Sequence, residues 1–181
     1  MILGKTIIFV GVSGVGKTTF LRVASSHLSF QHLSAGTLIA QARLSTDRGR
    51  DALRLADLDE NQRLLVSGFD LHRDPGAKLV VLDGHVVIHG SRGLQPLGST
   101  VFSSLGANAF VHMVADPAFI AENRLRDSER TRPLLSLAEI ADHQGKSIDV
   151  ATCLANSLAI PIKLIAPADM DEFCAFAADL C

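Results

Sequence analysis

Several features that would assign a protein to a class are missing from this sequence of 181 residues. It has three cysteines, Cys153, Cys174 and Cys181, with no Cys-x-x-Cys pair, which argues against a disulfide framework or a zinc finger. The formal net charge of −2 gives no overall attraction to nucleic acid or to an anionic membrane. We therefore expect a cytoplasmic protein with reduced, mostly buried thiols, the terminal Cys181 being exposed.

Long apolar runs and internal boundaries are also missing. No apolar stretch approaches the roughly 18 to 20 residues needed to cross a bilayer, and the opening MILGKTIIFVG is too short for a signal peptide. There is no internal repeat, low-complexity segment or polar linker. The expectation is a single domain spanning residues 1–181.

Short apolar runs alternate with segments of helical spacing, which predicts a parallel α/β sheet with right-handed crossovers. Ligands of such sheets bind at the carboxyl ends of the strands, and Gly11, Asp83 and Asp116 all come just after predicted strands. The five predicted strands are residues 5–10, 30–34, 78–83, 108–114 and 161–165.

Local signals set the expected helix bounds. A first helix is predicted over residues 17–28, and Asp116-Pro117 can cap a helix after the fourth strand. Ser136 and Glu139 have capping-box spacing for a long helix ending near Leu158. Residues 89–100, rich in Gly and Pro, are predicted as loop.

The clearest motif runs from Gly11 to Thr18 and matches G-x-x-x-x-G-K-[ST] at every defined position. Its glycines allow backbone N–H groups to surround a phosphate, and the following helix adds a favourable dipole. Lys17 would reach the β- and γ-phosphates of ATP, and the Thr18 hydroxyl would ligate Mg²⁺. The predicted ATP contacts are Gly11, Ser13, Gly14, Val15, Gly16, Lys17, Thr18 and Thr19.

Asp83 ends an apolar strand, where a carboxylate has no packing role, so we predict that it helps to hold Mg²⁺. His85 follows and is predicted to hydrogen-bond a phosphate or an attacking water. His112 lies inside a predicted strand and is expected to be packed or on the surface.

Arginines gather in two places. Arg124, Arg126 and Arg130, with Arg132 nearby, suit a lid that closes over the transferring phosphoryl group. Arg50 and Arg54 lie between the second and third predicted strands, where they would face the acceptor.

Six segments occur in this order along the chain: GVSGVGKTT, LSAGTLI, RDALRLADLDENQ, VVLDGH, NRLRDSERTRP and EIADHQ. Together they resemble nucleoside-monophosphate kinases, and most of all the archaeal-type adenylate kinases. The resemblance covers residues 7–165, nearly the whole chain. It implies a three-layer P-loop fold with strand order 2-3-1-4-5. It also implies an acceptor-binding helical insertion at about 36–74 and a short lid at about 125–135.

The activity implied by this resemblance is reversible, Mg²⁺-dependent transfer of the γ-phosphoryl group from ATP to a nucleoside monophosphate, with AMP the favoured acceptor. The resemblance implies catalytic roles for Lys17, Asp83, Arg124, Arg126 and Arg130. It also implies that Thr18 and Asp83 organise the metal. The resemblance further implies a small nucleotide acceptor as partner and a homotrimer.

The acceptor side departs from the common bacterial pattern. Ala40 stands where Gly-Asp-x-x-Arg places its arginine, and His85, Val86 and Val87 replace the Phe-Pro-Arg that usually follows Asp-Gly. Archaeal-type sequences also lack both arginines. The predicted acceptor contacts are Ser34, Gly36, Arg50, Arg54, His85 and Arg92.

Two other functions fit the residues. A kinase for a small alcohol or a nucleic-acid end would need a base, which Asp83 or His85 could supply. An ATP-binding regulatory module with slow hydrolysis could use His85 to position water.

Overall fold

The fold is known from a computed structural model that describes residues 4–45, 58–90, 93–127 and 134–181. Five parallel strands form one sheet in the order β2-β3-β1-β6-β7. Counted in chain order, these five strands have the order 2-3-1-4-5, so the predicted topology is confirmed. Their bounds are β1 (Lys5–Val10), β2 (Gln31–Ser34), β3 (Leu79–Asp83), β6 (Ala109–Met113) and β7 (Ile162–Ile165).

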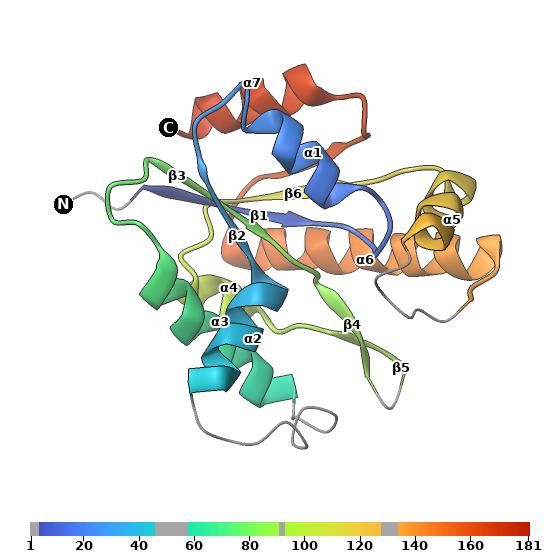
Figure 1. Ribbon diagram of the computed structural model, residues 1–181, viewed down its shortest axis with the longest axis horizontal. Coiled ribbons are helices and arrows are strands. Elements are labelled where there is room, and N and C mark those ends of the chain that lie inside the picture. Colours follow the sequence, from blue (N-terminus) through green and yellow to red (C-terminus); the bar gives the residue numbers. More distant parts are fainter. Residues whose placement is uncertain (1–3, 46–57, 91–92, 128–133) are drawn as a thin grey trace.

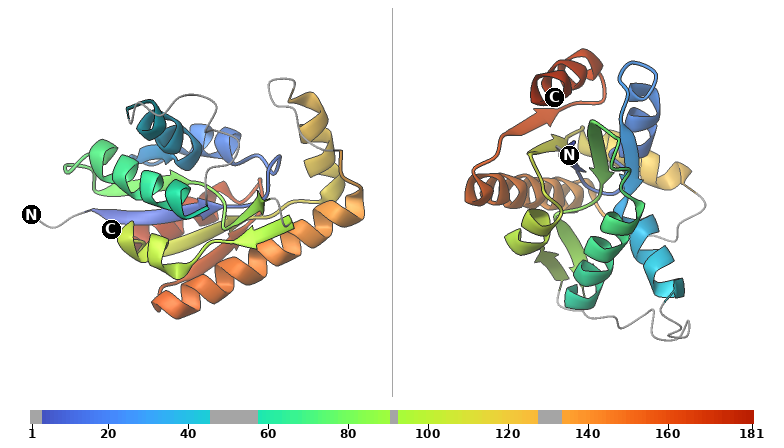
Figure 2. Two further views of the ribbon diagram at one scale, coloured as in Figure 1. Left: turned by 90° about the horizontal axis from the view of Figure 1, so that it is seen from below. Right: turned by 90° about the vertical axis from the view of Figure 1, so that its left-hand side faces the viewer.

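Helices cover both faces of this sheet and complete three layers (Figure 1). One face carries α1 and α7, and the other carries α3, α4 and the long α6. Figure 2 shows α5 at the end of the molecule opposite the two termini. The helices are α1 (Lys17–Ala24), α2 (Ala35–Ser45), α3 (Leu58–His72), α4 (Ser99–Ser104), α5 (Pro117–Arg126), α6 (Leu137–Leu158) and α7 (Met170–Leu180).

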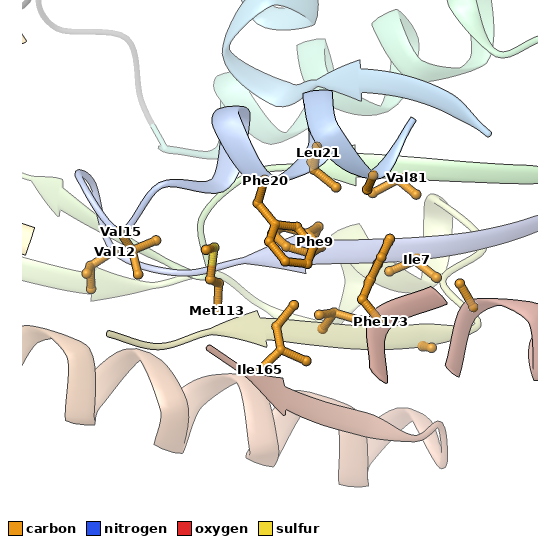
Figure 3. Close-up of a cluster of buried hydrophobic side chains, with 14 of the residues drawn as sticks. Ile7, Phe9, Val12, Val15, Phe20, Leu21, Val81, Met113, Ile165 and Phe173 are labelled. Atoms are coloured by element: carbon orange, nitrogen blue, oxygen red, sulfur yellow. The ribbon is translucent and has the colours of Figure 1, made fainter. Parts of the chain in front are cut away.

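The three central strands are apolar because side chains on both of their faces are buried. On the α1 side, Phe9 stacks on Phe20 with centroids 5.6 Å apart, and Phe173 of α7 meets Phe9 edge-on at the same centroid distance (Figure 3). On the other side, Phe102 of α4 packs edge-on against Phe110 of β6. These two cores fix the strand ends that carry the candidate site.

Helix ends follow local hydrogen bonding. The predicted capping box of α6 is present: the Glu139 N–H donates to Ser136 Oγ, and the Ser136 N–H donates to the Glu139 carboxylate. Helix α1 ends at Ala24, four residues before the predicted end. The hydroxyls of Ser25 and Ser26 donate to carbonyls one turn back, which favours turns there over a continued helix.

The prediction of a loop over residues 89–100 was wrong. The segment contributes to a β-hairpin, β4 (Val87–Gly90) with β5 (Gly93–Pro96), and to the start of α4. The Leu97 N–H donates to the Val86 carbonyl and extends the hairpin ladder by one step. Lys146 of α6 donates to the Leu94 carbonyl and links the hairpin to the rest of the fold. Glycine and proline content does not reveal such contacts, so local sequence pointed to a loop.

The expectation of mostly buried thiols was also wrong. All three cysteines are free; Cys153 and Cys181 are exposed and Cys174 is partly buried. Cys153 lies on the outer face of α6, whereas the neighbouring Ala151 and Ala155 are buried against the sheet. Across the described ranges of the chain, no helix combines the length and apolar character that a membrane span requires.

Candidate phosphate-binding and acceptor site

The loop between β1 and α1 has the backbone that its glycines predict. Gly14 and Gly16 have φ of 94° and 105°, a region that favours glycine. A Cβ at Gly14 would lie 2.5 Å from Arg124 Cγ and 3.1 Å from the Ile120 carbonyl oxygen. Helix α1 begins immediately afterwards at Lys17, so its free N–H groups face the loop. The arrangement is a ready anion site.

Lys17 lies inside this loop and is 8% exposed. Its Nζ donates to the Gly11 carbonyl at 2.9 Å and to the Val12 carbonyl at 3.4 Å. The ammonium group is therefore held at the point where β1 ends. From there it can turn toward a phosphate that enters the loop.

Asp83 ends β3, one strand away from the loop, and is 9% exposed. His32 of β2 lies nearby, with its Nε2 4.0 Å from Asp83 Oδ2. Asp83 and Thr18 line the same cleft. A hydroxyl, a carboxylate and phosphate oxygens are the hard oxygen ligands that Mg²⁺ binds, often through retained water, so these residues fit that metal.

The segment after β3 is attached to the end of β1 by two hydrogen bonds. The Gly84 N–H donates to the Phe9 carbonyl at 3.0 Å, and His85 Nδ1 lies 2.9 Å from the Gly11 carbonyl oxygen. Both His85 and Lys17 therefore contact the same carbonyl of Gly11. The sequence pattern alone did not indicate this contact.

Helix α5 packs directly on the phosphate-binding loop. Asp116 caps it by accepting from the Ala118 N–H, as predicted, and Asn123 Nδ2 donates to the Gly14 carbonyl at 3.0 Å. Arg124 reaches the Ser13 carbonyl at 3.5 Å, whereas Arg126 lines the cleft and pairs with Glu122. Asn123 was missed by sequence reasoning, because an uncharged amide beside two arginines gives no signal.

A cleft of about 900 Å³ joins these features. Beyond Asp83 it opens into a part that we call the acceptor pocket, built from the end of β2, from α2 and α3 and from the hairpin region. Helices α2 and α3 pack closely: a Cβ on Gly68 would come within 3.1 Å of the Leu38 carbonyl oxygen. The acceptor pocket is lined by Ser34, Ala35, Gly36, Ile39, Leu65, Ile88 and Leu97.

The opposite part of the cleft lies beside α1 and α5 and continues to the segment after β7. It is lined by Thr19, Val23, Phe119, Asn123, Arg126, Asp127, Pro167 and Met170. Residues Ser13 to Thr19 of the phosphate-binding loop, Lys17 among them, line the same cleft as both of these parts.

His112 lies on β6 and is fully buried, on the sheet face opposite Asp83. Its Nε2 lies 2.9 Å from Ser147 Oγ of α6. Burial, and secondarily the positive charge of Lys17, lower the pKa of His112 to about 4. It is a packed histidine, one of the two placements expected from the sequence.

The structure thus brings most of the predicted site residues into one cleft. The P-loop residues from Ser13 to Thr19 line it together with Ser34, Gly36, Asp83, His85 and Arg126. Arg124 is not among the residues that line the cleft. It donates to the Ser13 carbonyl and lies against Gly14 of the phosphate-binding loop. The predicted contacts Arg50, Arg54, Arg92 and Arg130 lie outside the described residues.

Comparison with known proteins agrees with this geometry. The model of the AAA domain family matches residues 10–141. The adenylate kinase of Methanoculleus marisnigri is 28% identical over 174 residues, 90% of each chain. That of Thermoplasma acidophilum is 31% identical over 147 residues, covering 76% of this chain and 75% of the relative. Among solved structures, a gluconokinase from Sinorhizobium meliloti 1021 aligns over 98% of this chain and 94% of its own with a TM-score of 0.54; at 15% identity it shows the fold alone.

The fold and the phosphate-binding loop define a P-loop kinase. Because the matches extend over most of the chain, the similarity is not confined to the loop that many NTPases share. This chain belongs to the AAA domain family, and its relatives place it among the P-loop nucleoside-monophosphate kinases of the archaeal adenylate kinase type.

Proposed function

We propose that this protein transfers the γ-phosphoryl group of ATP reversibly to the phosphate of a nucleoside monophosphate, with AMP as the favoured acceptor. The observation that carries the proposal is the cleft itself. It joins an anion-binding loop to an acceptor pocket on the far side of Asp83. The related adenylate kinases support AMP as the acceptor.

The chemistry of the acceptor pocket favours a nucleobase over a sugar acid. Ile39, Leu65, Ile88 and Leu97 give it apolar walls. Among the described residues that line this pocket, Ser34 has the one polar side chain, with Asp83 and His85 at its border. The described apolar walls suit the faces of a flat base, which would be buried against them, better than they suit the hydroxyls of a sugar acid.

The proposed roles follow from charge. Lys17 and Arg126 would stabilise negative charge on the phosphoryl group as it moves. Thr18 and Asp83 would hold Mg²⁺, which supplies charge neutralisation at the phosphates when it is bound. No general base is required, because the attacking oxygen of an acceptor phosphate is already ionised.

The organisation proposed for the chain is one kinase domain over residues 1–181, with acceptor binding by about 36–74 and a lid at about 125–135. Arg50, Arg54 and Arg92 are proposed to bind the acceptor phosphate, and Arg130 to belong to the lid. A homotrimer and a cytoplasmic location stay predictions from the resemblance and the composition.

The test is a coupled assay for ADP with MgATP and a panel of acceptors. The panel contains AMP, GMP, CMP and UMP together with gluconate and glycerol, and Lys17→Ala is the inactive control. Rapid ADP formation with one or more monophosphates, strongest with AMP, supports the proposal. Turnover only with an alcohol acceptor, or ATP hydrolysis that no acceptor accelerates, would refute it.

A further inference from the structure

Helix α5 contacts the phosphate-binding loop at one turn, residues 12–15, which we call the loop turn. The Val15 N–H closes this turn by donating to the Val12 carbonyl oxygen, with an N–O distance of 3.3 Å. That distance is longer than the roughly 2.7 to 3.2 Å typical of such bonds. Gly14, inside the turn, has φ of 94°, and glycine has the most backbone freedom to lose when its conformation is fixed. The turn's own hydrogen bond therefore restrains its backbone only weakly.

Asn123 of α5 supplies a shorter hydrogen bond to the same turn. Its Nδ2 donates to the Gly14 carbonyl oxygen at 3.0 Å. Arg124 adds a longer contact, 3.5 Å, with the carbonyl of Ser13. The packing between helix and turn is close, since a Cβ on Gly14 would lie 3.1 Å from the Ile120 carbonyl oxygen. The loop turn is thus held from outside by α5.

The direction of a peptide carbonyl also sets the direction of the N–H in the same peptide. A trans peptide is planar and points its C=O and N–H to opposite sides, and the described residues contain no cis peptide bond. A hydrogen bond that fixes the Gly14 carbonyl therefore fixes that whole peptide plane. Backbone N–H groups of the loop are the donors that would hold a phosphate. A loop already fixed in its binding conformation loses less conformational entropy when the ligand binds.

We propose that Asn123 is a positioning residue for phosphate binding: through the Gly14 carbonyl it holds the loop turn in its anion-binding conformation before any ligand is present. The proposal rests on the proposed function only in taking a phosphate chain as the ligand of the loop. Asn123 also lines the part of the cleft beside α1 and α5. Direct contact with the nucleoside of ATP is therefore the alternative that an experiment has to separate from positioning.

Two substitutions remove the amide donor while leaving side chains of different size. Asn123→Leu keeps a side chain branched at Cγ, whereas Asn123→Ala removes everything beyond Cβ. Leu125→Ala is the matched control, because Leu125 lies on the same helix and is 71% exposed. Calorimetry with Mg²⁺ and no acceptor measures the binding of two probes. Inorganic tripolyphosphate has the phosphate chain alone, and a non-hydrolysable ATP analogue has the nucleoside as well.

We expect both Asn123 variants to bind both probes about fivefold more weakly, the scale of one hydrogen bond, and Leu125→Ala to stay within about twofold of the unsubstituted protein. A loss confined to the ATP analogue would overturn the proposal, because Asn123 would then contact the nucleoside. Loss in only one Asn123 variant would attribute the effect to side-chain volume, and an equal loss in Leu125→Ala would attribute it to α5 as a whole. Either result overturns the proposal, as does no loss in any variant. Melting temperatures check that each variant is folded.

A second measurement needs no ligand. Hydrogen exchange followed by NMR reports how often the Val15 N–H is released from the Val12 carbonyl. In both Asn123 variants we expect this amide to exchange about fivefold faster than in the unsubstituted protein, because the bond that anchors the turn is gone. An unchanged rate would contradict a role that acts through the loop.

These experiments are independent of the acceptor. Neither contains AMP, so a failed acceptor assay leaves their results intact, and a failure here leaves the acceptor assay unaffected. If tripolyphosphate does not bind to the unsubstituted protein, the loop is not a site for a phosphate chain alone, and the proposal for Asn123 is overturned.

Discussion

The phosphate-binding loop and the acceptor pocket share one cleft but are held by different forces. The loop is set by backbone conformation and by hydrogen bonds to carbonyls: Gly14 has positive φ, and Lys17, His85 and Asn123 each donate to a loop carbonyl. The acceptor pocket is set by apolar packing between α2, α3 and the hairpin region. The phosphate-binding loop should therefore tolerate almost no substitution, whereas the acceptor pocket should tolerate substitutions that preserve side-chain volume.

The largest effect should come from the loop cation. Lys17→Ala removes the ammonium group held at the phosphate-binding loop, and under the proposed function we expect kcat with ATP and AMP to fall by at least about 100-fold. Steady-state kinetics measures the change. Lys5→Ala, at an exposed position of β1, is the matched control and should leave kcat unchanged. Comparable losses in both variants would show that charge at this site is not what matters.

Acid sensitivity should come from His112 of β6, which packs against α6 on the sheet face opposite Asp83. The pKa of His112 is about 4 in the folded protein, below its ordinary value of 6.5, because the buried ring stays neutral. Between pH 6.5 and 4 the unfolded chain binds the extra proton, so stability falls as pH falls, by about 1.4 kcal/mol per pH unit and about 3 kcal/mol in all. Denaturant unfolding at several pH values measures this. His112→Gln, which can still bond Ser147, should flatten the dependence; an unchanged slope would contradict it.

Two glycines compare the regions directly. Gly14→Ala forces a side chain into positive φ and against Arg124, so we expect a loss of about 2 kcal/mol in the free energy of unfolding and weaker ATP binding. Gly36→Ala, at the acceptor pocket, meets no atom within 4 Å, and should be neutral or slightly stabilising because alanine favours the helix. Urea unfolding measures the free energy of unfolding of both variants. Similar decreases in the two would contradict the proposed difference between the loop and the acceptor pocket.

A smaller effect is expected when a substitution in the acceptor pocket changes KM for AMP without changing the affinity for ATP. Ile39→Trp narrows the acceptor pocket from α2 and should raise KM for AMP about tenfold while leaving the affinity for ATP unchanged. Leu44→Trp, on the same helix but 77% exposed, is the control and should change neither. A KM change for ATP in Ile39→Trp would mean that the two parts of the cleft are not independent.

Features set by residues close together in the chain could be predicted from the sequence, whereas features set by packing between distant segments could not. The phosphate-binding loop and the capping box of α6 depend on residues close together in the chain, so their geometry followed from local patterns. The five strands were recognisable as apolar runs because helices cover both faces of the sheet. The β4-β5 hairpin was missed because its contact with the rest of the fold comes from Lys146, which lies 52 residues from Leu94 in the chain and gives no local signal.

The candidate site divides in the same way. Lys17, Thr18 and Asp83 were identified by motif, and they do line one cleft. The apolar wall formed by Ile39, Leu65, Ile88 and Leu97 was not identified, since those side chains look like ordinary core until the fold brings them together. The contact between His85 and Gly11 could not be predicted either, because hydrogen bonding across 74 residues leaves no pattern in the sequence.

The central claim is that the acceptor of the phosphoryl group is itself a phosphate. Incubating the protein with Mg²⁺, AMP and ATP labelled at the γ-phosphate tests this most directly. We predict that the label appears in the β-phosphate of newly formed ADP, at a rate that rises with AMP and is lost in Lys17→Ala. Label recovered as inorganic phosphate at a rate independent of AMP would contradict it.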